Sequence, residues 1–213
     1  MEDTASKIAE FLLQIKAIRL QPNKPFTWSS GWKSPVYCDN RIALSHPRIR
    51  TYIRQELVKV IEYNFGRPEV IAGVATAAIA QGALVAEALG LPFIYVRAAA
   101  KGHGLQNKIE GEAHATQSAV VIEDLISTGR SSLAVVETLR EAGVIVKGIV
   151  SIFNYGFQAA ADLFHHAGCP VYSLSNYETM LRIAVETGYI GEDNLDTLRE
   201  WREQPATWTG VVR

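Results

Sequence analysis

Residues 120–131, with the sequence "VVIEDLISTGRS", place two carboxylates shortly before a turn that contains small hydroxyl residues. The apolar start predicts a buried strand, Glu123 and Asp124 stand where we expect that strand to end, and Ser127–Ser131 turn the chain into a helix. A helix start offers free backbone N–H groups and a partial positive charge, and small residues let a phosphate approach them closely. The carboxylates would repel a phosphate but suit the hydroxyl groups of a sugar. The stretch therefore predicts a site for ribose 5-phosphate.

One other interpretation of this stretch stays open from the residues alone: the acids could be solvated surface residues before an ordinary helix start. A P-loop is excluded, because the pattern G-x-x-x-x-G-K-[ST] needs a lysine after its second glycine. Here Arg130 follows Gly129, and two acids precede the turn. The complete string behind an apolar strand favours the sugar-phosphate site.

The polar segment 99–117, "AAKGHGLQNKIEGEAHATQ", is a second place where chemistry could occur. It carries Lys101, His103 and Lys108 among glycines, and Arg97 lies just before it. Glycines permit movement and cations suit a pyrophosphate group, so we expect a loop that closes over an anionic substrate. A long polar loop in a compact domain is otherwise a solvated segment with incidental charge.

The elements that must position these residues alternate between apolar strands and helices, which predicts βαβ crossovers and a buried parallel sheet. We expect an α/β fold with a doubly wound, mainly parallel sheet and a small N-terminal hood. The first helix is predicted over Ile8–Ile18, and a second from Pro47 to a point before Gly66. The expected domains are a helix-and-hood subdomain at 1–45 and an α/β core with C-terminal helices at 46–213.

Composition narrows the class of protein further. The chain has 213 residues, 48% hydrophobic and 20% charged, with a formal net charge of -1. Nothing in it suggests bulk attraction to nucleic acid or to an anionic membrane, and no apolar run reaches the roughly 20 residues of a membrane helix. The N-terminus lacks a signal-peptide pattern, and two cysteines make no disulfide framework, so we expect a cytoplasmic protein.

The stretch 120–131 resembles the signature with which type I phosphoribosyltransferases bind phosphoribosyl pyrophosphate (PRPP). The segments "YVRAAAKGHGLQNKIEG" and "FTWSSGWKSPVYCDNR" resemble the mobile loop and the acceptor-binding hood of the orotate phosphoribosyltransferases within that family. The resemblance implies transfer of a phosphoribosyl group from PRPP to orotate. It assigns PRPP binding to Arg97, Lys101, His103, Glu123, Asp124, Leu125, Ile126, Ser127, Thr128, Gly129, Arg130 and Ser131. Orotate binding falls to Lys33, Tyr37, Cys38, Arg41 and Ser127, and catalysis to Lys101, His103 and Asp124.

The resemblance also implies a cofactor and a partner. Mg²⁺ would be held mostly through PRPP, with Asp124 as the one protein carboxylate that could join it. The chain would form a homodimer in which the loop at residues 98–116 reaches into the neighbouring active site.

The chain departs from the common pattern of this family in four places. Ser29, Ala77 and Ala98 stand where basic residues are frequent, and Asn154 and Tyr155 stand where many members have an arginine for the orotate carboxylate. Lys33, Arg41 and backbone N–H groups are the remaining candidates for that carboxylate. A phosphoribosyltransferase for a purine base and a PRPP-sensing regulator without catalysis are the competing hypotheses.

Overall fold

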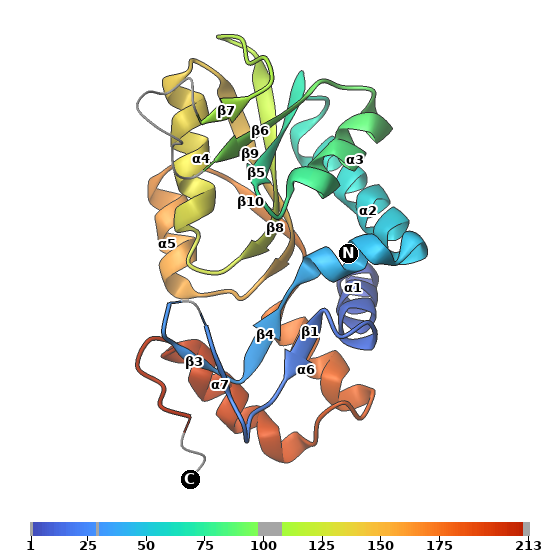
Figure 1. The fold of residues 1–213 in the computed structure, drawn as a ribbon, viewed down its shortest axis with the longest axis vertical. Helices are drawn as coiled ribbons and strands as arrows, with labels where there is room; N and C mark the ends of the chain where they lie inside the picture. The colour runs from blue at the N-terminus through green and yellow to red at the C-terminus, as the bar shows by residue number, and fades with distance from the viewer. Residues whose placement is uncertain (1, 29, 98–107, 211–213) are drawn as a thin grey trace.

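The computed structural model describes residues 2–28, 30–97 and 108–210, and Figure 1 shows an upper α/β body above a smaller lower part. The body contains a six-stranded sheet in the order β10–β9–β8–β5–β6–β7. All neighbours run parallel except β7, which is antiparallel to β6. The strands are β5 (Val70–Ala75), β6 (Phe93–Arg97), β7 (Ile109–Glu110), β8 (Ser118–Ile126), β9 (Ile145–Asn154) and β10 (Val171–Asn176).

Helices cover both faces of this sheet, which confirms the expected doubly wound architecture. From β5 the chain proceeds through α3 to β6 on one side, and from β8 it proceeds through α4 and α5 to β9 and β10 on the other. Crossovers between parallel strands are right-handed, so connections that run in opposite directions along the sheet put their helices on opposite faces. Figure 1 shows α3 on one face and α4 and α5 on the other. These helices are α2 (Pro47–Phe65), α3 (Ile79–Leu89), α4 (Arg130–Glu141) and α5 (Gln158–His166). The aliphatic side chains between the layers, including most of β8, are fully buried.

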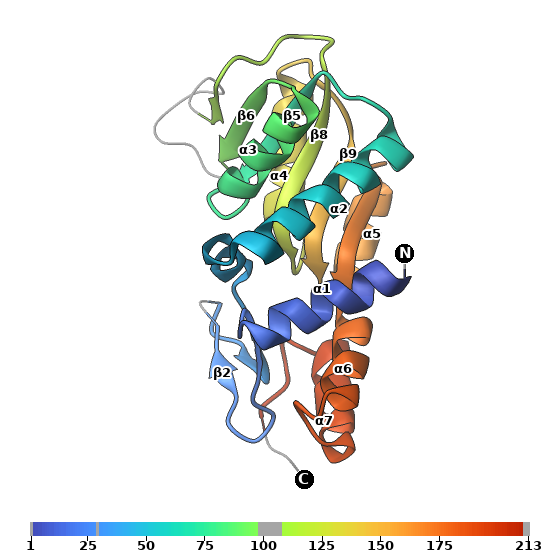
Figure 2. The same cartoon turned by 90° about the vertical axis from the view of Figure 1, so that its right-hand side faces the viewer.

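The lower part combines both ends of the chain. Strand β1 (Ile18–Leu20) pairs with β4 (Val36–Cys38), and β2 (Phe26–Thr27) pairs with β3 (Lys33–Ser34). Helix α1 (Glu2–Gln14) packs against α6 (Tyr177–Glu186) and β10, and Figure 2 shows it between the sheet and the C-terminal helices. Helix α7 (Leu195–Glu203) follows the 3-10 turn η3 (Glu192–Asn194). The division at residue 45 stays a prediction, and the C-terminal helices pack beside the N-terminal segment.

Tyr155 joins this lower part to the sheet. Its ring is 1% exposed and lies 5.4 Å from the ring of Trp28, 6.1 Å from that of Tyr177 and 5.6 Å from that of Trp201. The Trp201 indole donates a hydrogen bond of 3.1 Å to the carbonyl oxygen of Lys33. The hood, the end of β9 and helix α7 therefore share one aromatic cluster, in which buried edge and face contacts stabilise their relative positions.

Several predicted boundaries hold and others shift. Helix α2 begins at Pro47 and ends before Gly66 as expected. The first helix was predicted to reach Ile18 but ends at Gln14, because Lys16 adopts a positive φ of 58° and Ile18 instead pairs with Cys38 in the hood.

Two strand predictions also change. Strand β8 continues past the acid pair to Ile126, because it keeps pairing with the long strand β9. The segment expected to be all loop contains β7, in which Ile109 pairs with Val96 and packs against the core. Within the described ranges, no helix has the length and apolar character needed to cross a membrane.

Candidate active site at the turn between β8 and α4

The turn after β8 lies where the sheet changes winding direction. The chain leaves β5 toward β6 and leaves β8 toward β9, and β5 and β8 are neighbours in the sheet. In open α/β sheets, ligands bind beyond the carboxyl ends of the strands at such a point. The candidate phosphate-binding residues Ser127–Ser131 therefore occupy the position that this architecture reserves for a ligand.

Gly129 fixes the shape of this turn. It precedes α4 with φ 75°, a left-handed conformation that favours glycine. A Cβ atom at this position would lie 2.7 Å from Cε2 of Phe164, so helix α5 closes the space behind the turn. The first N–H groups of α4 therefore follow a glycine, and no side chain stands in front of them at the tightest part of the turn. This arrangement suits the close approach of an anion.

A cavity of about 570 Å³ opens between this turn and the hood. Its size lies within the range of small-molecule sites. Among the described residues, the walls carry aromatic rings, hydroxyl groups, one thiol and one formal charge, that of Arg130. The residues that line it are Thr27, Trp28, Ser30, Trp32, Tyr37, Cys38, Leu125, Ser127, Thr128, Arg130 and Tyr155. Such a surface suits a flat, partly polar ring bound beside a phosphate.

The acid pair stands at the edge of this site, and neither acid lines the cavity. Glu123 is 4% exposed, and its carboxylate accepts hydrogen bonds from the Ser132 hydroxyl at 2.6 Å and from the Asp124 backbone N–H at 3.0 Å. Burial and the charge of Asp124 raise the pKa of Glu123 to about 8, although the Ser132 hydrogen bond opposes this shift. Burial also raises the pKa of Asp124. The assignment of both acids to the ribose hydroxyls stays a prediction.

The raised pKa of Glu123 predicts a pH-dependent stability. The unfolded chain releases this proton near the ordinary pKa of 4.5, whereas the folded chain keeps it until about 8. The stability contributed by the neutral carboxyl is therefore complete below pH 4.5 and is lost as pH rises through 8. We expect Glu123→Gln, whose amide can still accept the Ser132 hydrogen bond, to reduce this loss by on the order of 1–3 kcal/mol.

Urea unfolding below and above this pH window measures the effect on the free energy of unfolding. The matched control is Glu137→Gln, which changes an exposed carboxyl on α4. Part of the pH dependence should survive in Glu123→Gln, because Asp124 shifts in the same direction. An identical pH dependence in Glu123→Gln and the unaltered protein would contradict the buried neutral carboxyl.

The hood is tied to the acid pair by hydrogen bonds. The side-chain amide of Asn40 donates to the backbone carbonyl of Asp124 at 2.7 Å, and the Cys38 thiol donates to the Asn40 amide oxygen at 3.3 Å. Burial, followed by the charges of Asp124 and Asp39, raises the pKa of Cys38, so the thiol faces the cavity in its neutral form. These bonds hold one wall of the cavity against the end of β8.

The structure brings together only part of the predicted orotate set. Ser127, Tyr37 and Cys38 line the cavity, whereas Lys33 and Arg41 do not. The Lys33 ammonium donates to the Thr27 hydroxyl at 2.8 Å. The Arg41 guanidinium binds both carboxylate oxygens of Asp39 at 2.7 and 3.0 Å.

The predicted PRPP residues also divide. Leu125, Ser127, Thr128 and Arg130 line the cavity, and Ile126, Gly129 and Ser131 belong to the same turn without lining it. Arg97 ends β6, two strands away from β8, and its guanidinium pairs with Glu110 at 3.3 Å. Lys101 and His103 lie outside the described residues, as do Ser29 and Ala98.

Sequence reasoning missed four wall residues of the cavity, namely Thr27, Trp28, Ser30 and Trp32, and also the role of Asn40. A usable signal was present, because both indoles lie inside the hood segment and their rings stack 6.4 Å apart. Tyr155 was seen only as the replacement for an arginine, and its burial between two elements could not be read from one sequence.

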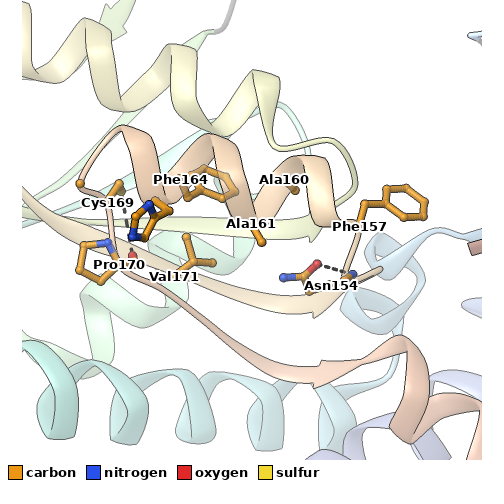
Figure 3. Close-up of a pocket in the computed structure, with 11 residues that line it drawn as sticks. Asn154, Phe157, Ala160, Ala161, Phe164, Cys169, Pro170 and Val171 are labelled. Carbon is orange, nitrogen blue, oxygen red and sulfur yellow. Dashed lines mark hydrogen bonds between the residues drawn. The ribbon is translucent and has the colours of Figure 1, made fainter. Parts of the chain in front are cut away.

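A second cavity of about 590 Å³ runs along α5. Figure 3 shows its wall, with Phe157, Ala160, Phe164 and Val171 among the labelled side chains. Asn154 is also labelled there, and its side-chain oxygen accepts a hydrogen bond from the Gly156 backbone N–H at 2.7 Å. None of the predicted site residues lines this cavity, so it is not part of the candidate active site.

Comparisons with known proteins agree with this geometry. The family model described as "Phosphoribosyl transferase domain" matches residues 43–171. A protein of Porphyromonas gingivalis named orotate phosphoribosyltransferase is 52% identical over 208 residues, covering 98% of this chain and 99% of that protein. One from Bacillus cytotoxicus with the same name is 52% identical over 200 residues, covering 94% and 95%.

Solved structures give the same result. The orotate phosphoribosyltransferase of Aeropyrum pernix superposes with a TM-score of 0.75 at 29% identity, covering 86% of this chain and 99% of that one. UMP synthase of Leishmania donovani superposes with a TM-score of 0.80 at 26% identity, covering 94% of this chain and 42% of that chain.

A glycine turn at the switch point of a parallel sheet agrees with the matching family model, which defines the class: the chain belongs to the phosphoribosyltransferase family. Within that family, full-length identity of 51–53% places it among the orotate phosphoribosyltransferases.

Proposed function

We propose that this protein transfers the phosphoribosyl group of PRPP to orotate, giving orotidine 5′-monophosphate and pyrophosphate. The observation that carries the proposal is the cavity shared by the β8–α4 turn and the aromatic hood. The turn offers N–H groups for a phosphate, and the rings offer flat surfaces for a base. The names of the full-length relatives support the same acceptor.

The proposed mechanism assigns separate tasks to the two sides of the cavity. Backbone N–H groups of Ser127–Ser131 hold the 5-phosphate, and Glu123 and Asp124 hold the ribose hydroxyls. As the bond from the anomeric carbon to pyrophosphate breaks, positive charge develops on the ribose ring, and the nearby Asp124 carboxylate stabilises it. A ring nitrogen of orotate then bonds to the anomeric carbon from the opposite face, and the N–H proton of that nitrogen passes to water.

The mobile-loop residues are proposed to act on the leaving group. Arg97, Lys101 and His103 contact the pyrophosphate, neutralise the charge that develops on its oxygens and exclude water from the sugar cation. Protonated His103 donates a proton to the departing pyrophosphate, because an adjacent phosphate favours the charged imidazole.

We propose Mg²⁺ as the cofactor. The described residues contain no group of three or more His, Cys, Asp or Glu side chains that could hold a metal ion. A hard cation bound mainly by pyrophosphate and ribose oxygens fits this donor set, with Asp124 as the protein carboxylate that could join them. When bound, Mg²⁺ would neutralise charge on the leaving oxygens.

A homodimer and a cytoplasmic location complete the proposal. Within residues 98–116, the part before β7 is proposed to reach across the dimer interface into the neighbouring site, as the family resemblance implies, since β7 itself pairs with β6 of the same subunit. Cys38 and Cys169 are free thiols, which fits a reducing compartment such as the cytoplasm.

A base-competition assay tests the acceptor. With PRPP and Mg²⁺, we expect the purified protein to consume orotate and release an equal amount of pyrophosphate, and to leave adenine and hypoxanthine unchanged. Preferential turnover of adenine or hypoxanthine would mean that the acceptor is a purine base and that orotate was wrongly assigned. Binding of PRPP with no turnover of any base would favour the PRPP-sensing regulator instead.

A further inference from the structure

Among the described residues, one cation lines the cavity and could meet an anionic acceptor. That residue is Arg130, and it is exposed. Within the described part of the chain, the Arg130 side chain forms no hydrogen bond and no ion pair. Because Arg130 is one of the residues that line this cavity of aromatic and hydroxyl side chains, its guanidinium is available to a ligand there.

Three other cations of the hood already have partners. Arg41 is bound to both oxygens of Asp39, and this bond lowers the pKa of that carboxyl. Lys33 donates to Thr27, and Arg19 lies over the rings of Phe26 and Tyr37, 5.3 and 4.7 Å from their centroids. None of the three lines the cavity.

We propose that the Arg130 side chain binds the carboxylate of orotate. Entry of a carboxylate between Trp28, Trp32 and Tyr155 is unfavourable unless a charged donor accompanies it. A guanidinium can bind both carboxylate oxygens at once. The 5-phosphate of PRPP is bound by the backbone N–H groups of the same turn. Arg130 would therefore bind the phosphate through its main chain and orotate through its side chain. This proposal rests on the proposed function.

The test compares two variants at one position. In Arg130→Met, which keeps the length of the side chain, we expect the KM for orotate to rise about 10- to 100-fold, the loss of a charge-assisted pair. The KM for PRPP should change less than about 3-fold, which is small on the same scale. Arg130→Lys should recover part of the orotate affinity, because it restores the charge but not the paired donors. Uracil, the same ring without the carboxylate, should inhibit the unaltered protein and Arg130→Met equally.

The possible outcomes distinguish a failure of the Arg130 proposal from a failure of the proposed orotate activity. If the unaltered protein does not use orotate, both proposals fail. If it uses orotate and Arg130→Met keeps the same orotate KM, only the role of Arg130 is overturned. A rise confined to the KM for PRPP would assign the side chain to the phosphate and would also overturn it. Both variants should unfold at the same Tm as the unaltered protein, because the substituted side chain is exposed, and this measurement checks that the fold is intact.

Discussion

Asp124→Asn is expected to lower kcat by about 100- to 1,000-fold while the protein folds normally, in line with the loss of one electrostatic contact to a transition state. The carboxylate lies near the end of a buried strand that leads into the candidate phosphate turn, where the ribose ring develops positive charge in the proposed reaction. The amide has the same shape but no charge. Because burial raises the pKa of Asp124, the neutral amide should not weaken the fold.

Steady-state kinetics and urea unfolding on the same preparation check both parts of this expectation. Asp162→Asn is the matched control, since it makes the same change on the exposed surface of α5 and should leave kcat unaltered. An Asp124→Asn variant with ordinary kcat would mean that the acid pair takes no part in the reaction.

Lys101→Ala is expected to lower kcat by about 100-fold or more and to change the KM for PRPP by less than about 5-fold. The reason is that charge builds on pyrophosphate as it leaves, so a loop cation interacts more strongly with the transition state than with bound PRPP. Lys24→Ala removes an exposed lysine between β1 and β2 and serves as the control. Unchanged turnover in Lys101→Ala would remove the loop from the mechanism.

The two variants together test whether the loop acts across a dimer. If it does, a mixed dimer of Lys101→Ala and Asp124→Asn subunits contains one site with both substitutions and one with neither. Coexpression should then restore about a quarter of the ordinary activity from two inactive chains. A coexpressed mixture as inactive as its parents would place the loop in its own subunit or leave the protein monomeric.

The fold could be predicted well where local signals agreed. Proline at the first position of α2 and glycine after its last determined both ends of that helix, and the apolar run before the acids predicted β8. Prediction failed where pairing between distant segments decided the outcome. Ile18 has helical spacing from Ile8, but its pairing with Cys38 placed it in a strand, and Ile109 entered a strand because β6 offered an unpaired edge.

The candidate site followed the same division. The turn around Gly129 was predictable, because a glycine between hydroxyl residues and the start of a helix favours one local backbone conformation, with a positive φ. The orientation of Glu123 was not, because it depends on Ser132 in the next helix as well as on its own strand. The availability of Arg130 likewise depends on the partners of Arg41, Lys33 and Arg19, which become known only when the hood is folded.

Tyr155 contacts rings from the hood and from the C-terminal helices, and it also lines the cavity. The rings of three residues that are far apart in the sequence pack against one another: Trp28, Tyr155 and Trp201. A substitution at one of these positions therefore changes the space available to the other two side chains. Acceptor preference in this lineage should therefore evolve by concerted replacements at distant positions, since a single replacement in the hood would disturb the neighbouring rings.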